Sequence, residues 1–200
     1  MAEKLVIEIF KQKTVEQFAK CISDPASKLE SGSVAAATAM LSASLLCRAV
    51  ELTTAGKEAD EPLAYLVRNS ATMRDYMVHL VDEDVKSRGP LRRALKEGDA
   101  QKIEAAYQPA ACISAEVIGM MLHELELLGT LVELCPPEVK HLCMESTELA
   151  LSAVRTARWY ILSLCTHSTD DTYTFVTRRE NEILLAQAEE LAQKIRSKMN

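Results

Sequence analysis

One acidic residue has an unexpected position in the predicted helix of residues 60–87. At about 100° per residue, the apolar side chains of this helix gather on one side. Asp84 lies four residues after Leu80 and seven after Met77, which places it in the middle of that apolar face. A carboxylate in such a place is unfavourable unless it is paired, hydrogen-bonded or protonated. The pattern therefore makes Asp84 the first candidate for chemistry.

Two interpretations of Asp84 remain open. The helix ends near Gly89, so its last turn would lie outside the core, or the carboxylate would pair with Arg88 one turn later. Alternatively, Asp84 lines a ligand cleft, where a carboxyl group with a perturbed pKa can accept and donate a proton.

The opposite side of this helix carries polar residues at spacings of three and four. They are Asp75, His79, Asp82 and Lys86. Acidic and basic residues at these spacings stabilise an exposed helix face. We expect a solvated stripe here.

A second polar stripe runs along the predicted helix of residues 137–165, which is otherwise apolar on most of its circumference. Its members are Glu145, Glu148, Ser152, Arg155 and Trp159. A solvated face is one interpretation. The other is a wall of the same cleft, in which Arg155 binds a carboxylate.

Metal ligands and basic clusters give weaker signals. Glu138 and His141 have the Glu-x-x-His spacing of helical di-iron sites, but such sites need two of these pairs and further glutamates. We therefore expect no bound metal. The basic clusters are Arg88, Arg92, Arg93 and Lys96, and then Arg178 and Arg179. They are expected to be solvated, although they could also attract an anionic ligand tail.

Helices are the elements that must position these residues. Capping residues, Gly and Pro predict the following helical segments: 15–22, 33–54, 60–87, 91–96, a segment opened by Asp99 and interrupted near Pro109, 110–134, 137–165, and a last helix opened by the box at 177–180. Ser33 is the expected N-cap of the second. No segment alternates long enough to predict a strand. We expect an all-α fold, a bundle of long antiparallel helices, with residues 1–200 as a single domain.

Composition narrows the classes of function. The net charge of −6 argues against nucleic acid as a partner, because phosphate contacts need clustered basic residues. The start of the chain carries no signal-peptide pattern, and the best transmembrane candidate, residues 34–50, is rich in Ala and Ser and contains Arg48. We interpret it as a buried core helix.

The six cysteines form no C-x-x-C pair and are expected to be mostly buried, reduced thiols. Together these features predict a cytoplasmic protein that binds no membrane.

The order of several motifs resembles a known enzyme family. A short helix precedes a Ser-Asp-Pro loop, Gly32-Ser33-Val34-Ala35-Ala36 opens a small-residue helix, and Leu52-Thr53-Thr54-Ala55-Gly56-Lys57 closes it. Leu80-Val81-Asp82-Glu83-Asp84-Val85 then follows on a later helix. This series resembles the formiminotetrahydrofolate cyclodeaminase and methenyltetrahydrofolate cyclohydrolase family. Family members carry a Pro-Gly-Gly-Gly-Ser loop, a Leu-Thr-x-Gly-Lys stretch and an Asp-x-Asp-Ala motif.

The resemblance implies an all-α homodimer whose cleft takes a reduced folate as substrate. It implies loss of ammonia from a formimino group with ring closure, or hydrolytic opening of a methenyl bridge, and neither reaction needs a metal or a redox cofactor. Asp84 matches the second aspartate of the family motif and would be the acid–base residue. The implied substrate-binding residues, together with the candidate from the polar stripe, are Ser31, Gly32, Ser33, Lys57, Asp82 and Arg155.

The chain also departs from the family pattern. Leu29-Glu30-Ser31-Gly32 replaces the triple glycine, and Glu30 adds both bulk and negative charge where glycines allow close approach to a ligand. The family's later Ser-Asp pair and Asn-x-x-x-Asn spacing have no counterpart around residues 143–146 and 161–165. These differences support a second hypothesis, a catalytically silent member that binds a ligand or a partner protein.

Overall fold

Long helices make up the structure, a computed structural model that describes residues 9–56 and 60–199. In chain order the elements are η1 (Phe10–Gln12), α1 (Val15–Ser23), α2 (Ser31–Thr54), α3 (Glu61–Ser87), α4 (Gly89–Glu97), α5 (Ala100–Leu134), η2 (Pro137–Val139), α6 (Lys140–Cys165) and α7 (Asp171–Ser197). No strand occurs within these described ranges. The predicted all-α fold is therefore confirmed.

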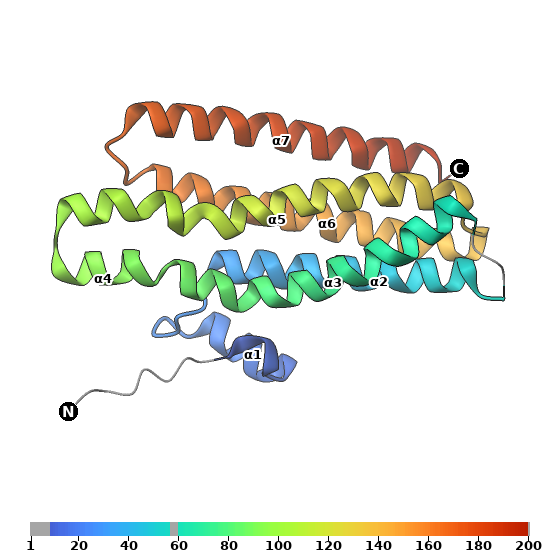
Figure 1. Ribbon diagram of the computed structural model, residues 1–200, viewed down its shortest axis with the longest axis horizontal. Coiled ribbons are helices and arrows are strands. Elements are labelled where there is room, and N and C mark those ends of the chain that lie inside the picture. The colour runs from blue at the N-terminus through green and yellow to red at the C-terminus, as the bar shows by residue number, and fades with distance from the viewer. Residues whose placement is uncertain (1–8, 57–59, 200) are drawn as a thin grey trace.

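The long helices run back and forth along one axis, while α1 lies outside the bundle (Figure 1). Helix α2 packs against α3 and α6, and α6 also packs against α5 and α7. Short connections make successive long helices antiparallel. As a result, the start of α2, the end of α3 and the end of α6 lie in the left half of the bundle in Figure 1, and the short α4 lies at its left end.

Several helix boundaries follow from local signals that the sequence contains. Thr14 and Gln17 form the predicted capping box at the start of α1. The carboxylate of Asp60 accepts a hydrogen bond from the Leu63 N–H at 3.3 Å and caps α3. Gly98 ends α4 with a φ of 68°, a left-handed conformation that glycine adopts without steric penalty. These boundaries confirm the predictions made from capping residues.

The predicted interruption near Pro109 is wrong, because α5 continues through this proline. A helical proline removes its own N–H donor, and its ring crowds the carbonyl four residues earlier. Pro109 lies on the exposed side of α5, where water can satisfy the carbonyl that loses its partner. The buried Tyr107, Ala110 and Ala111 pack on the other side and hold the two halves in one helix.

Two helix starts also differ from the sequence prediction. Helix α7 begins at Asp171, because Asp170 accepts a hydrogen bond from the Tyr173 N–H at 2.9 Å, so the box at 177–180 lies within the helix. Helix α2 begins at Ser31 with Glu30 as N-cap, and the Glu30 side chain makes no capping hydrogen bond. Ser33 is therefore not the cap, and its side chain is available for a contact outside the helix.

Helix α2, which is rich in Ala and Ser, lies in the interior of the bundle. Its length and composition would allow it to cross a membrane. In this fold, however, Ala35, Ala36, Ala39, Ala43 and Ala49 are all fully buried against neighbouring helices. The helix thus forms part of the core, as the interpretation of residues 34–50 predicted. The cysteines are free thiols, and four of the six are buried.

Candidate functional site

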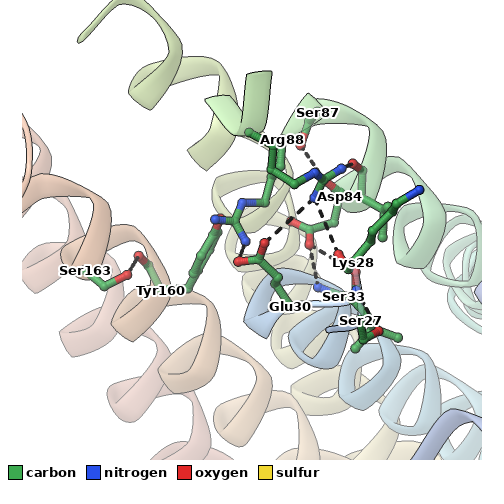
Figure 2. A network of polar contacts seen from close by, with 12 residues as sticks. Ser27, Lys28, Glu30, Ser33, Asp84, Ser87, Arg88, Tyr160 and Ser163 are labelled. Atoms are coloured by element: carbon green, nitrogen blue, oxygen red, sulfur yellow. Dashed lines mark hydrogen bonds and ion pairs between the residues drawn. The ribbon is translucent and has the colours of Figure 1, made fainter. Parts of the chain in front are cut away.

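Asp84 is the centre of a polar cluster where the end of α3 meets the start of α2. Its side chain is 0% exposed and faces the first turn of α2 (Figure 2). The interpretation in which the end of α3 leaves the core is therefore wrong. Pairing with Arg88 is wrong as well, because the hydrogen bonds of Asp84 go to Ser33 on the neighbouring helix.

Ser33 and Gly32 hold the carboxyl group of Asp84 over the start of α2. The Ser33 N–H donates to Asp84 Oδ2 at 2.9 Å, and the Ser33 hydroxyl lies 3.0 Å from the same oxygen and 2.9 Å from the Val81 carbonyl. A Cβ at position 32 would overlap the Asp84 carboxyl group, so the close approach requires glycine here. Asp84 thus caps α2 from another helix, and the positive end of the α2 dipole faces its carboxyl group.

The environment of Asp84 raises its pKa from 3.8 to about 6. Burial is the main cause, because removal from water disfavours the charged form. The two hydrogen bonds from Ser33 and the charge of Arg92 act in the opposite direction and limit the rise. A carboxyl group that titrates near neutral pH can both accept and donate a proton.

Two arginines and one glutamate border this carboxyl group. Arg88 forms an ion pair with Glu30, and the side chains of both point toward one another beside Asp84 (Figure 2). A terminal nitrogen of Arg92 lies 3.8 Å from Glu30 Oε1. Arg92 also donates hydrogen bonds to the carbonyls of Val85 and Lys28, the latter at 3.5 Å. The arginines therefore tie α4 and the end of α3 to the loop before α2.

Tyr160 of α6 completes the cluster. Its ring lies beneath the Arg88 guanidinium, with 4.8 Å from Cζ to the ring centroid, a cation–π distance. The tyrosine hydroxyl is buried and has no hydrogen-bond partner among the described residues, and the same holds for Asp84 Oδ1 and Arg88 Nε. Burial also raises the pKa of Tyr160, so its hydroxyl keeps its proton at neutral pH. Unpaired buried polar groups are rare, and a ligand or a water molecule that satisfies them is one explanation.

Asp82 has a structural position instead of the expected solvated one. Its carboxylate accepts hydrogen bonds from the backbone N–H of Phe10 at 2.7 Å and of Lys11 at 3.4 Å. Asp82 is 7% exposed, so it does not belong to a solvated stripe with Asp75. The sequence prediction was wrong at this residue because η1 packs onto this side of α3 and covers it.

The other predicted ligand residues lie in different environments. Arg155 makes an ion pair with Glu189 of α7 at 2.8 Å on an exposed surface, and Glu148 pairs in the same way with Arg196. This favours the solvated-face interpretation of that stripe. Ser31 is the exposed first residue of α2. Lys57 lies outside the described residues. The structure thus brings together Gly32, Ser33 and Asp84 from the predicted set.

A second buried carboxyl group was missed by the sequence analysis. Glu124 of α5 is 0% exposed. Its Oε1 accepts hydrogen bonds from the hydroxyls of Ser42 on α2, at 2.5 Å, and Ser146 on α6, at 3.0 Å. Its Oε2 has no partner in the described part of the chain. Burial raises the pKa of Glu124 from 4.5 to about 8. Glu124 lies three residues after Met121 and four before Leu128, on an apolar face of its helix. The same pattern identified Asp84, so it could also have identified Glu124.

The chain is similar to known proteins in both its sequence and its fold. The family model described as formiminotransferase-cyclodeaminase matches residues 14–182. The crystal structure of formiminotetrahydrofolate cyclodeaminase from Thermotoga maritima has a TM-score of 0.85 to this fold at 16% sequence identity, and the match covers 94% of this chain and 96% of that one. At this identity the likeness shows a shared fold. No curated protein sequence matches the chain.

Proposed function

Because the chain belongs to the formiminotransferase-cyclodeaminase family, we propose that it acts on a tetrahydrofolate derivative, with Asp84 as the acid–base residue. The family and the shared fold point to folate-related cyclodeaminase or cyclohydrolase activity. One observation carries the assignment to Asp84. Its Oδ1 has no partner within residues 9–56 and 60–199, while Oδ2 is fixed by Ser33 and the pKa is about 6.

In the cyclohydrolase reaction, the ionised Asp84 accepts a proton from a water molecule as the water oxygen attacks the carbon of the methenyl bridge. The carboxyl group then donates this proton to one bridge nitrogen as the bond from that nitrogen to the carbon breaks. The second proton of the water leaves as the carbonyl of the formyl group forms on the other nitrogen. A pKa near 6 suits both transfers, since each protonation state is accessible at neutral pH.

The cyclodeaminase reaction uses the same residue. Asp84 accepts the proton of the secondary amine nitrogen outside the pterin ring, which attacks the formimino carbon to close the methenyl bridge, and it donates a proton to the nitrogen that departs as ammonia. The Tyr160 hydroxyl, which stays protonated, donates a hydrogen bond to the bound ligand. Neither reaction requires a metal or a redox cofactor, so we propose a folate substrate and no cofactor.

A second candidate function is a catalytically silent member that binds a ligand or a partner protein. The observation that favours it is the shielding of Asp84, which is fully buried beside the ion pair of Glu30 and Arg88. In this case Asp84 acts only as a cap for the first turn of α2. The two candidates differ in turnover, because a silent member has none.

The substitution Asp84→Asn tests the catalytic assignment. Asparagine keeps the shape of the side chain and can accept the hydrogen bonds of Ser33, but it cannot carry the proton. We expect kcat for methenyltetrahydrofolate hydrolysis and for formiminotetrahydrofolate deamination to fall by about 100-fold or more, with a small change in KM. Steady-state kinetics with both substrates measure this.

The matched control is Asp75→Asn on the same helix, where the carboxylate is exposed and pairs with Arg74 at 2.8 Å. This variant should keep wild-type turnover. Equal kcat for wild type and Asp84→Asn would disprove the role of Asp84. No turnover of either substrate by the folded wild type would leave the silent candidate.

We further propose that the chain is a cytoplasmic homodimer, as the family resemblance and the free cysteines support. Light scattering at micromolar concentration should give twice the mass of 22.1 kDa. A monomer under these conditions would contradict the proposal.

A further inference from the structure

Glu30 occupies the N-cap position of α2 without capping it. A residue at this position usually accepts a hydrogen bond from the N–H groups of the first turn. Here the N–H of Ser33 donates to Asp84 instead, and the Glu30 side chain makes no capping bond. Its carboxylate turns toward Arg88 and Arg92, and its side chain remains 33% exposed. Glu30 therefore lies between solvent and the buried polar cluster.

Arg88 and Arg92 are the two cations that face the carboxylate of Glu30. They are one turn apart, and the guanidinium of Arg88 is nearly buried against the Tyr160 ring. Two neighbouring guanidinium groups repel each other, and burial further disfavours the charge of each. A carboxylate facing both groups relieves this repulsion, and planar guanidinium groups bind carboxylates through paired hydrogen bonds. Glu30 supplies that carboxylate from within the chain.

The contact with Glu30 leaves part of the cluster unsatisfied. Three groups are buried and make no hydrogen bond to any residue that the structure describes: Arg88 Nε, Asp84 Oδ1 and the Tyr160 hydroxyl. They come from α3 and α6 and surround the place where Glu30 meets Arg88 (Figure 2). A larger ligand with its own carboxylate can satisfy these groups, whereas the single carboxylate of Glu30 does not.

We infer that Arg88 and Arg92 form a binding site for the carboxylate of an external ligand, and that Glu30 fills this site until the ligand displaces it. The inference rests on the proposed function, because the displaced Glu30 also uncovers Asp84. Glu30 is then an internal competitor, and its charge sets how tightly an anionic ligand binds. Only a ligand with a carboxylate displaces Glu30, so only such a ligand gains access to Asp84.

The test compares the binding of two probes by calorimetric titration. One is 5-formyltetrahydrofolate, and the other is 4-aminobenzoylglutamate, which carries the carboxylates of a folate without its pterin ring. Glu30→Gln removes the competing charge and keeps the bulk, and Glu30→Gly removes both. We expect both variants to bind 4-aminobenzoylglutamate at least tenfold more tightly than the wild type does. Adding Arg88→Gln to Glu30→Gln should abolish this gain.

The matched control is Glu148→Gln, which breaks the ion pair with Arg196 on an exposed surface and should bind like the wild type. Thermal melts provide a second measurement, in which 4-aminobenzoylglutamate should raise the melting temperature of Glu30→Gln more than that of the wild type. Equal affinities for wild type and Glu30→Gln, a gain that survives Arg88→Gln, or no binding to either Glu30 variant would overturn the inference.

The two probes separate this inference from the proposed function. One outcome is that Glu30→Gln binds 4-aminobenzoylglutamate tightly, binds 5-formyltetrahydrofolate no more tightly, and turns over neither folate substrate. This result would support the carboxylate site at Arg88 and Arg92 and would contradict the folate activity. Turnover of folate substrates with equal kinetics in wild type and Glu30→Gln would keep the activity and reject the role of Glu30.

Discussion

Two buried carboxyl groups in this protein have similar immediate partners and different surroundings. Asp84 and Glu124 are both 0% exposed. Asp84 accepts a hydrogen bond from the hydroxyl of Ser33 on α2, and Glu124 accepts hydrogen bonds from the hydroxyls of Ser42 on α2 and Ser146 on α6. Each leaves one carboxyl oxygen without a partner, and burial raises the pKa of each. By burial and pKa alone, both would be candidates for an active site.

The neighbours of the two groups make the difference. Around Asp84 lie a helix N-terminus, two arginines, a tyrosine hydroxyl and the partly exposed Glu30. Among the described residues, the hydrogen-bond partners of Glu124 are Ser42 and Ser146, and neither carries a charge. Glu124 thus joins α2, α5 and α6 as a neutral acid. Burial and a raised pKa are not sufficient for a site, which also needs charged groups and a route to solvent.

The pH dependence of stability should separate the two groups most clearly. Because the folded-state pKa of Glu124 is about 8 against 4.5, the stabilising effect of its neutral form is complete below pH 4.5 and is lost as the pH rises to 8. One such group changes the free energy of unfolding by about 1.4 kcal/mol per pH unit. The wild type should therefore lose about 4 kcal/mol from this group between pH 5 and pH 8.

Urea unfolding at several pH values measures this effect, with Glu124→Gln as the variant that cannot ionise. In Glu124→Gln, the remaining loss should be about 1.4 kcal/mol and should lie between pH 5 and 6, where Asp84 with its pKa of about 6 still titrates. Identical slopes for wild type and Glu124→Gln would show that Glu124 is not buried as a neutral acid.

Gly32→Ala tests the close packing that distinguishes the Asp84 cluster from the Glu124 cluster. The added methyl group would overlap the Asp84 carboxyl group, which must then move away from Ser33. We expect a loss of about 3 kcal/mol in the free energy of unfolding, as for overpacking in a core. Chemical denaturation measures it.

Gly119→Ala is the control, because a Cβ at this exposed position of α5 meets nothing within 4 Å. Alanine there should stabilise the protein by roughly 0.5–1 kcal/mol. Combining Gly32→Ala with Asp84→Ala should recover most of the loss, since the overlapping group is gone. Strictly additive effects in the double variant would contradict the assigned contact.

Most of the fold could be predicted from the sequence, because helix periodicity and capping are local properties. The boundaries set by Thr14, Asp60 and Gly98 agree with the structure. The interruption predicted at Pro109 fails, because packing on the buried side of α5 outweighs one lost hydrogen bond. Local patterns thus identify helices well, and tertiary packing decides where they continue.

The site was predictable only in part. Asp84 stood out because its position on an apolar face is a local signal, and the same test would have found Glu124. The role of Asp82 was not visible, because its partners Phe10 and Lys11 lie about seventy residues earlier in the chain. The contacts of Glu30 and Tyr160 with Arg88 depend on how the helices pack, and no single-helix pattern contains that information.

Ser33→Ala gives the smallest effect and tests whether the hydroxyl tunes Asp84. The Ser33 hydroxyl bond lowers the pKa of Asp84, so its loss should raise that pKa further and cost about 1 kcal/mol of stability. In the Glu124→Gln background, the stability loss assigned to Asp84 should then extend to higher pH than 6. Ser146→Ala in the same background should leave this pH range unchanged, because Ser146 contacts Glu124 and not Asp84. If the pH range shifted equally in both variants, the two clusters would be coupled. The distinction between Glu124 as a neutral acid of the core and Asp84 as a titrating group of the candidate site would then not hold.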